Sequence, residues 1–252
     1  MPARRAASSR PHWASSAYRG DGGAGFNPAV KGQTSRQFEL GAKWRQPAWG
    51  VDAALFSADT EDEIGVLSNT GGRSIFQNVG RTRRYGAELS LLWRAAPGLK
   101  LQAVSSLLHA SYRDGFGSGA SAVAAGNRIA GTQRASAWAQ VAWQPGAVAG
   151  GVAGGSAGGL AGEWALEWRA VARTAVNDIN SDFAAGYSLA ALRWSGQLRL
   201  GAADTLELLA RVDKLFNRVY AGSVIVNDGN GRFFEPGLPR NGLLSMRWLH
   251  RW

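Results

Sequence analysis

The chain contains 252 residues, of which 45% are hydrophobic, and it carries a formal net charge of +10 and no cysteine. The lack of cysteine excludes disulfide bonds and thiolate metal sites. No run of about 18 apolar residues occurs, which excludes membrane-spanning helices but not membrane-spanning strands, because a barrel strand directs only half of its residues toward lipid. The basic residues are spread along the chain and do not form one patch, so we expect no nucleic-acid binding.

The N-terminal segment, residues 1–32, lacks regular alternation, and we expect it to be irregular and to end in a loop. It is basic and rich in serine and alanine. It contains no apolar stretch of about 7–15 residues, which a secretory signal peptide requires. For an exported protein, we therefore expect either a start that lies upstream of Met1 or a fragment of a longer reading frame.

Residues 33–252 contain nine segments in which apolar and polar residues alternate, a pattern typical of strands with one apolar face. Seven of them are 34–45, 49–59, 75–94, 98–112, 132–144, 163–175 and 187–200, and the last two include 206–212 and 244–252. We expect one face to carry Leu89, Leu91, Leu166, Trp168 and Leu208, and the other to carry Glu88, Glu167, Arg169 and Arg211. Most segments exceed the roughly 9–11 residues that cross a bilayer at a tilt, whereas strands of soluble sandwiches have about 5–6. The fold class that this favours is all-β, an antiparallel transmembrane β-barrel.

A tryptophan closes every second segment. Trp44, Trp93, Trp143 and Trp194 are separated by 49, 50 and 51 residues, which predicts hairpin repeats with one indole each at a shared membrane boundary. Short turns at 46–48, 95–97 and 201–203 follow three of them, whereas long loops at 60–74, 113–131, 176–186 and 217–241 lie at the opposite end. A Gly/Ala tract at 146–162 is the exception, and we interpret it as an insertion. Outer-membrane barrels have short periplasmic turns and long external loops, so nine strands place Trp252 at the periplasmic rim.

The final stretch carries a family resemblance. ARVDKLFNRVYAG (210–222) resembles the penultimate strand of TonB-dependent outer-membrane receptors, and GRFFEPGLPRNGLLSMRWLHRW resembles their last strand with its terminal aromatic residue. NPAVKGQTSRQFELGAKW (27–44) and FQNVGRTRRYGAELSLLW (76–93) match the same family in the expected order. Two departures are Lys214, where the family usually has asparagine, and His250, which interrupts the apolar face of the last strand.

This resemblance implies an architecture, a location and partners. Family members enclose an N-terminal plug in a 22-stranded barrel, and we expect residues 33–252 to form about nine of those strands, in the C-terminal part of the barrel, without the plug. The implied location is the bacterial outer membrane, in contact with its lipid and lipopolysaccharide. The implied partners are the TonB complex, through the missing N-terminal part, and the barrel-assembly machinery, through Trp248 and Trp252.

No pattern indicates an enzyme active site, and we expect no catalytic residue, metal site or cofactor. The three histidines, His12, His109 and His250, lack the spacing of metal ligands. We interpret the carboxylates at 60–63 and 177–182 as solvated loop acids, with a calcium or other metal site as the alternative. DGNG (228–231) lacks the downstream ligands of a calcium loop, so we interpret it as a tight turn.

The long loops offer arginine and aromatic side chains, which bind oxyanions and planar groups. In the family, such loops hold a ferric siderophore or a similar scarce nutrient. The candidate ligand-binding residues are Tyr112, Arg113, Asn127, Arg128, Tyr220, Arg232, Phe233, Phe234 and Arg240. The alternative is that these side chains only solvate loop tips or contact lipopolysaccharide phosphates.

The function that we expect is that of a receptor fragment, inactive by itself, because an open sheet leaves unpaired backbone groups that cost several kcal/mol each in lipid. Two alternatives are kept. One is a complete small outer-membrane pore or translocator barrel, which an even number of strands would favour. The other is a soluble β-rich binding module, whose strands would have both faces buried or polar.

Overall fold

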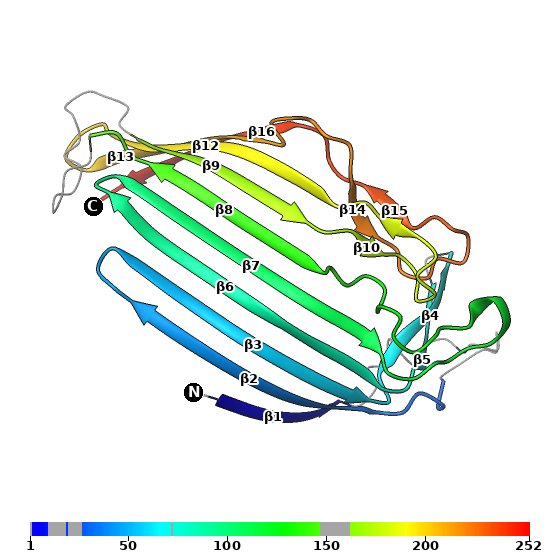
Figure 1. Ribbon diagram of the computed structural model, residues 1–252. Helices are drawn as coiled ribbons and strands as arrows, with labels where there is room; N and C mark the ends of the chain where they lie inside the picture. The colour runs from blue at the N-terminus through cyan, green and yellow to red at the C-terminus, as the bar shows by residue number, and fades with distance from the viewer. Residues whose placement is uncertain (1, 10–18, 20–26, 72, 147–161) are drawn as a thin grey trace.

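The main feature of the molecule is one antiparallel sheet of ten strands (Figure 1). The computed structural model describes residues 2–9, 19, 27–71, 73–146 and 162–252. Each strand of the sheet pairs with the next, in the order β1 (Pro2–Ser9), β2 (Gln33–Arg45), β3 (Trp49–Glu61), β6 (Thr82–Ala96), β7 (Leu99–Tyr112), β8 (Ala135–Trp143), β9 (Gly162–Val171), β12 (Tyr187–Arg199), β13 (Asp204–Asp213) and β16 (Asn241–His250).

Three two-stranded sheets occupy the long loops between these strands. They are β4 (Ile64–Thr70) with β5 (Arg73–Asn78), β10 (Thr174–Ala175) with β11 (Phe183–Ala184), and β14 (Ala221–Val224) with β15 (Phe234–Pro236). A 3-10 turn, η2 (Gly119–Ser121), lies in the loop after β7. Within the described residues, no helix is long and apolar enough to cross a membrane.

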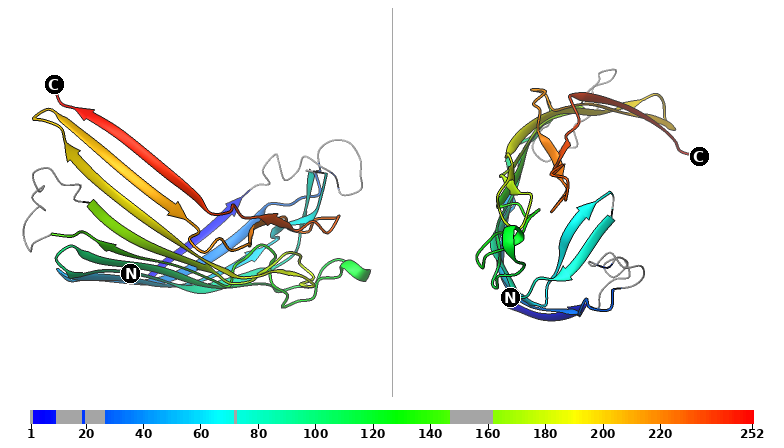
Figure 2. Two further views of the ribbon diagram at one scale, coloured as in Figure 1. Left: turned by 90° about the horizontal axis from the view of Figure 1, so that it is seen from above. Right: turned by 90° about the vertical axis from the view of Figure 1, so that its right-hand side faces the viewer.

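The large sheet curves into an incomplete cylinder and does not close (Figure 2). β1 and β16 form its two edges, and no pairing joins them in the described part of the chain. Ten is an even number of strands, which is what a complete small barrel would have. Because the two edges do not meet, however, the described sheet is not such a barrel.

The nine predicted segments correspond to the nine strands of the sheet from β2 to β16, with two differences. Residues 1–32 were expected to be irregular, but Pro2–Ser9 form β1 along β2. A strand at the edge of a sheet can be held by backbone hydrogen bonds even when its side chains do not alternate between apolar and polar, so the alternation pattern did not predict β1. The segment 75–94 is not one strand, because the backbone turns at Gly80, which has a φ of 77°, and separates β5 from β6. The His12 position and most of the Gly/Ala tract at 146–162 lie outside the described residues.

The register of the sheet confirms the predicted division into two faces. Residues opposite each other across neighbouring strands share a face. Leu166 lies opposite both Val141 and Leu192, and Leu91 lies opposite both Val51 and Ala103, so one face is apolar across the sheet. Many of its large side chains are exposed, including Leu40, Leu55, Leu89, Leu107, Leu166, Trp168, Leu244 and Met246.

The opposite face is polar, and ion pairs cross it from strand to strand. Glu163 pairs with Arg193 at 2.8 Å, and Glu167 binds Arg211 through two hydrogen bonds of 2.8 Å. Lys100 lies 3.9 Å from Glu163 and extends the row to β7. Carboxylates and cations of these neighbouring strands thus neutralise one another along this part of the face.

The polar face is the concave one. Glu63, at the base of the β4–β5 hairpin, accepts hydrogen bonds from Thr82 at 2.8 Å and from Arg84 at 2.8 Å, and both of these residues belong to the polar face. The hairpin itself extends inside the curve of the sheet (Figure 2). The apolar face is therefore the convex, outward one.

The two ends of the sheet differ as predicted. Short turns join β2 to β3, β6 to β7 and β12 to β13 at the end where the C-terminus lies, and the long loops gather at the other end (Figure 1). The four repeated tryptophans lie near the short-turn end. Indoles of neighbouring strands approach each other there, with centroids 5.0 Å apart for Trp44 and Trp49 and 6.5 Å apart for Trp164 and Trp194.

The last strand ends at His250, two residues before the predicted end at Trp252. The backbone N–H of Arg251 still donates to the carbonyl of Ala203 at 2.9 Å. The Trp248 indole and the His250 ring both contact Asp204, at 2.9 Å and 2.8 Å. Trp252 packs its ring edge-on against His250, with centroids 4.7 Å apart.

Gly86 on β6 provides a test of the close strand packing. A Cβ at this position would overlap the carbonyl oxygen of Leu107 and lie 2.7 Å from the Phe56 ring. We expect Gly86→Ala to lower the free energy of unfolding by about 1–3 kcal/mol, the usual range for overpacking. Unfolding in urea followed by tryptophan fluorescence measures this change.

The matched control is Gly41→Ala on β2, because a Cβ there meets only the carbonyl oxygen of Ala53 at 3.5 Å, an ordinary contact. Equal effects of the two substitutions would contradict the packing described at Gly86.

Candidate functional site

The most highly organised part of the long-loop end is a cluster of polar side chains around Asp178. We name it the loop cluster and define it as Tyr112, Asn127, Asp178, Asn180 and Asn227. Asp178 is only 5% exposed. Its carboxylate accepts hydrogen bonds from the Tyr112 hydroxyl at 2.7 Å, from the backbone N–H of Ala130 at 3.1 Å and from the Asn227 amide at 2.7 Å. Three donors thus satisfy the oxygen atoms of this buried carboxylate.

The asparagines of the loop cluster connect separate loops through their backbones. Asn127 donates to the carbonyl of Asp178 at 2.9 Å, and Asn180 donates to the carbonyl of Arg128 at 2.9 Å. Asn180 and Asn227 have positive φ angles of 58° and 52°. Asparagine tolerates this backbone conformation better than most residues, which explains its use at these positions.

The β4–β5 hairpin is held by the same cluster. The Asn227 side chain donates to the carbonyl of Val66 at 2.6 Å, and the side chain of Asn69 donates to the carbonyl of Val226 at 2.9 Å. The hairpin, the loop before β8, the loop after β9 and the loop before β16 are therefore joined into one unit. The two loops predicted to bind a ligand, 113–131 and 217–241, both belong to it.

Tyr112 occupies the interior of this unit. It is 3% exposed, and its ring packs with Val79 and Val123 in a small apolar core. Burial, together with the charge of Asp178, raises the pKa of the Tyr112 hydroxyl well above its ordinary value. The hydroxyl therefore remains a donor to Asp178. Tyr112, which was predicted to contact a ligand, positions the loops in this structure.

The loop that follows Tyr112 is held by an ion pair at its base. The Arg81 guanidinium donates to both oxygens of Asp114, at 2.7 Å and 3.0 Å, and this lowers the pKa of Asp114 to about 2. The backbone N–H of Arg113 donates to the carbonyl of Arg81 at 2.7 Å, while the Arg113 side chain is exposed. Of the predicted ligand residues in this loop, Arg113 is exposed, Asn127 and Arg128 are half-buried, and Tyr112 is buried.

The remaining predicted ligand residues lie on the loop that carries β14 and β15. Arg232 and Arg240 are exposed, and their backbone N–H groups are held by Asp228 and Asn217. Phe233 and Phe234 pack edge to face with centroids 6.3 Å apart, and Tyr220 packs on Tyr187 at 4.5 Å. These residues form a second group beside the loop cluster, linked to it through Asn227.

The acidic motifs have structural roles in the described residues. Asp178, within 177–182, is buried, so the prediction of a solvated acid is wrong at that position. Asp228 accepts the backbone N–H groups of Asn230 at 3.1 Å and Arg232 at 2.7 Å, which confirms the tight turn at 228–231. In the described part of the chain, no group of three or more His, Asp or Glu side chains is arranged to hold a metal ion.

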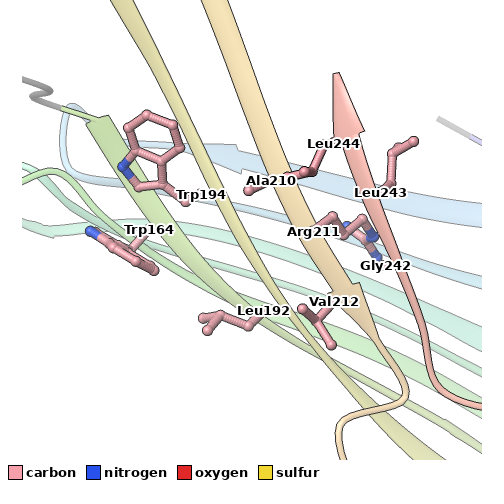
Figure 3. Close-up of a pocket in the computed structure, with 9 residues that line it drawn as sticks. All are labelled: Trp164, Leu192, Trp194, Ala210, Arg211, Val212, Gly242, Leu243 and Leu244. Carbon is pink, nitrogen blue, oxygen red and sulfur yellow. The ribbon is translucent and has the colours of Figure 1, made fainter. Parts of the chain in front are cut away.

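A separate pocket of about 650 Å³ lies at the β16 side of the sheet (Figure 3). Its walls are mainly apolar and come from β9, β12, β13 and β16, with Trp164, Leu192, Trp194, Ala210 and Leu244 among them. The one charged lining residue, Arg211, binds Glu167 and Asp213. This pocket suits hydrocarbon better than a polar ligand, and the loop cluster remains the candidate site.

A family model for the TonB dependent receptor-like β-barrel matches residues 5–213. This match covers more than half of the chain. The chain belongs to the TonB-dependent receptor family.

Three solved structures share the fold of this chain. The ferric yersiniabactin uptake receptor FyuA from Yersinia pestis matches 88% of this chain with a TM-score of 0.65 and 18% identity, over 31% of its own length. BauA, the ferric preacinetobactin receptor from Acinetobacter baumannii, matches 98% with a TM-score of 0.67 and 16% identity, over 33% of its length. The copper transporter OprC matches 98% with a TM-score of 0.71 and 17% identity, over 36% of its length. The chain thus spans about a third of each of these structures.

The loop cluster of this receptor chain predicts a large effect of Asp178→Ala. The substitution leaves the Tyr112 hydroxyl, the Ala130 N–H and the Asn227 amide without their acceptor, and each unsatisfied buried donor costs about 1–3 kcal/mol. We expect the loops to become sensitive to proteases and their amides to exchange faster.

Hydrogen exchange followed by mass spectrometry measures this loosening, and Asp182→Ala is the control. Asp182 lies on the same loop but is exposed. The role of Asp178 is refuted if exchange in 125–131 and 225–229 is the same in both variants.

Proposed function

We propose that this chain forms the C-terminal wall of a TonB-dependent receptor barrel that imports a ferric siderophore or a similar metal chelate. The family match over residues 5–213 carries the proposal. FyuA and BauA, which share the fold, are receptors for ferric siderophores. The role is one of binding and transport, not catalysis.

The outward apolar face supports an outer-membrane location. The convex face presents leucines and tryptophans to its surroundings, whereas the concave face carries charged residues, several of them in ion pairs. In a bilayer, apolar groups face lipid and charges face the lumen. The tryptophans near the short turns then form the periplasmic aromatic belt, and Trp248 and Trp252 extend it to the strand that the assembly machinery reads.

The open edges support a place in a larger barrel. Unpaired N–H and C=O groups on β1 and β16 would cost several kcal/mol each in lipid. Further barrel strands would satisfy them, in keeping with a chain that spans about a third of the structures it matches. We therefore propose that the 252-residue chain by itself transports nothing.

The metal of the ligand is the less defined part of the proposal. Two of the matched structures are ferric siderophore receptors, and one is a copper transporter. The exposed arginines and aromatic residues at 232–234 can bind the oxygen atoms and the planar groups of a chelate around either metal. We favour iron on the number of ferric receptors among the matches.

The membrane location predicts that Leu91→Arg is costly. Leu91 lies on the convex face near the middle of β6, and a lipid-facing arginine near the bilayer midplane costs about 2–4 kcal/mol. We expect reduced insertion of the receptor into outer membranes and a lower urea midpoint in phospholipid vesicles.

Ser90→Arg is the matched control, because Ser90 is the neighbouring residue and faces the concave side. Both variants add one charge to the same strand. If Ser90→Arg impairs insertion as much as Leu91→Arg does, the assignment of the two faces to lipid and lumen is wrong.

The receptor function predicts that the loop residues Arg232 and Phe233 contribute to uptake. In the complete receptor, we expect Arg232→Ala with Phe233→Ala to weaken binding by more than tenfold, since one charge-assisted hydrogen bond contributes about 1.5–3 kcal/mol. The measurement is uptake of radiolabelled iron by cells supplied with ferric catecholate, hydroxamate or carboxylate chelates, with a cupric chelate in parallel.

Receptor levels in the outer membrane are measured at the same time and should not change. Arg199→Ala, an exposed arginine on β12 at the opposite end of the sheet, is the control. Unchanged uptake of every chelate in the double variant would remove this loop from the binding site.

A further inference from the structure

Two arginines face each other where β8 and β9 enter the long loops. The pair Ser136 and Val171 and the bridge between Gln133 and Thr174 share one register, which places Arg134 directly opposite Arg173. Like charges in directly opposite positions destabilise a sheet. Both side chains are exposed, and neither has a carboxylate within ion-pair distance in the described residues.

A third arginine, Arg128, approaches the same place with an unsatisfied donor. Its backbone is fixed on both sides, because the N–H donates to the Asn180 amide oxygen at 2.8 Å and the carbonyl accepts from the Asn180 amide nitrogen at 2.9 Å. The Nη2 atom of its guanidinium is shielded from solvent and has no hydrogen-bond partner among the described residues. A buried donor without a partner is costly, and in native structures it often indicates an ion or ligand that is bound in use.

The electrostatics around Arg128 agree with this geometry. Burial lowers the pKa of Arg128, and the charges of Arg134 and Arg173 lower it further. The three guanidinium groups therefore repel one another. We name Arg128, Arg134 and Arg173 the arginine triad.

The arginine triad differs from three ion-paired arginines of the concave face. Arg84, Arg193 and Arg211 each bind a glutamate at 2.8 Å. Arg134 and Arg173 continue the same face, since they precede or follow Ser136 and Val171 by two residues. Arg173 has only a cation–π contact, with its guanidinium 4.7 Å from the centre of the Phe183 ring. Arg169, exposed on the same face of β9, likewise has no carboxylate within ion-pair distance in the described residues. The loop end of this face is therefore cationic, and the arginine triad leaves a place for an anion there.

We propose that the arginine triad is an oxyanion subsite that binds a carboxylate or phosphate group of the transported ligand. The proposal rests on the receptor function proposed above and adds the charge of the ligand and the residues that bind it. Arginine donors are arranged as planar forks that match the two oxygens of such groups. Because Arg134 and Arg173 face the concave side, the anion is one that enters the receptor and not a lipid phosphate on its outer surface.

Anion titration of the purified complete receptor tests the proposal. The probes are citrate and inorganic phosphate, added at constant ionic strength to lipopolysaccharide-free protein in detergent, and the readout is the thermal unfolding midpoint. We expect a saturable increase in the midpoint of the wild-type protein. Arg128→Gln and Arg134→Gln should weaken the apparent affinity by about 10- to 100-fold, as expected for loss of one charge-assisted hydrogen bond.

The thermal unfolding midpoints measured without anion give a second signal, of opposite sign to the loss of anion affinity. Arg134→Gln removes one of two opposed charges, so we expect it to unfold at a higher temperature than the wild type without anion. This gain shows that the variant is folded, and a purely structural arginine would give a loss. Arg134→Lys, which keeps the charge but not the fork, should retain only part of the anion response.

Arg199→Gln removes the same charge at the opposite end of the sheet and should leave the anion response intact. An equal response in the wild type and in the triad variants overturns the proposal, as does an equal loss in Arg199→Gln, which would indicate general charge screening. A stronger response to purified lipopolysaccharide than to citrate also overturns it, because the anion would then come from lipid.

The two proposals fail separately. Anion binding by the purified receptor requires neither TonB nor uptake. Normal chelate uptake together with no saturable anion response overturns the subsite and leaves the receptor function. A saturable response that depends on the triad, in a protein that takes up no chelate, would show that the anion site exists but does not serve transport. That result overturns the assignment of the anion to a transported ligand.

Discussion

Backbone pairing between antiparallel neighbours is the interaction on which the rest of this structure depends. Each strand from β1 to β16 in the large sheet bonds only to the strands beside it. Because side chains alternate along a strand, a fixed register assigns every residue of all ten strands to one face or the other, and a slip by one residue would exchange the faces. The apolar exterior, the row of ion pairs inside and the position of the loops all follow from that register.

The polar face and the loop end handle charge in different ways. Along the sheet, glutamates such as Glu163 and Glu167 lie between arginines and neutralise them. In the loops, the buried Asp178 is satisfied by neutral donors. The positive charges of the arginine triad are therefore not neutralised by this carboxylate. The wall from β9 to β13 therefore carries ion pairs, whereas the region around Arg128 is positive.

The sequence predicted the features that arise from local alternation and did not predict those that arise from distant contacts. Leu166 and Glu167 lie on the predicted faces because each strand carries its own period-two pattern. β1 has no such pattern, and only its backbone pairing with β2 reveals it as a strand. Tyr112 is a predicted ligand contact because it is an aromatic residue beside a long loop, but its partner Asp178 is 66 residues away and holds it inside. No local signal connects two such positions.

The same limit applies to the arginines. Arg128 was predicted as a ligand residue from its loop position alone. Arg134 and Arg173 were not selected, because their opposition appears only when the register of β8 and β9 is known. Asn180 and Asn227 could have been recognised as turn residues from their type. Their contacts with Arg128 and Val66, however, depend on the folded loops.

The contact between Asn227 and Val66 also bears on the order of folding. It joins residues 161 positions apart, whereas most neighbouring strands of the sheet are consecutive hairpins. Closing a long loop costs chain entropy before any contact repays it, so hairpins form early and distant contacts form late. We therefore expect the loop cluster to assemble after the strands between β6 and β13 have paired. A substitution that slows pairing anywhere in this interval would then delay completion of the loop cluster, although it touches none of the residues there.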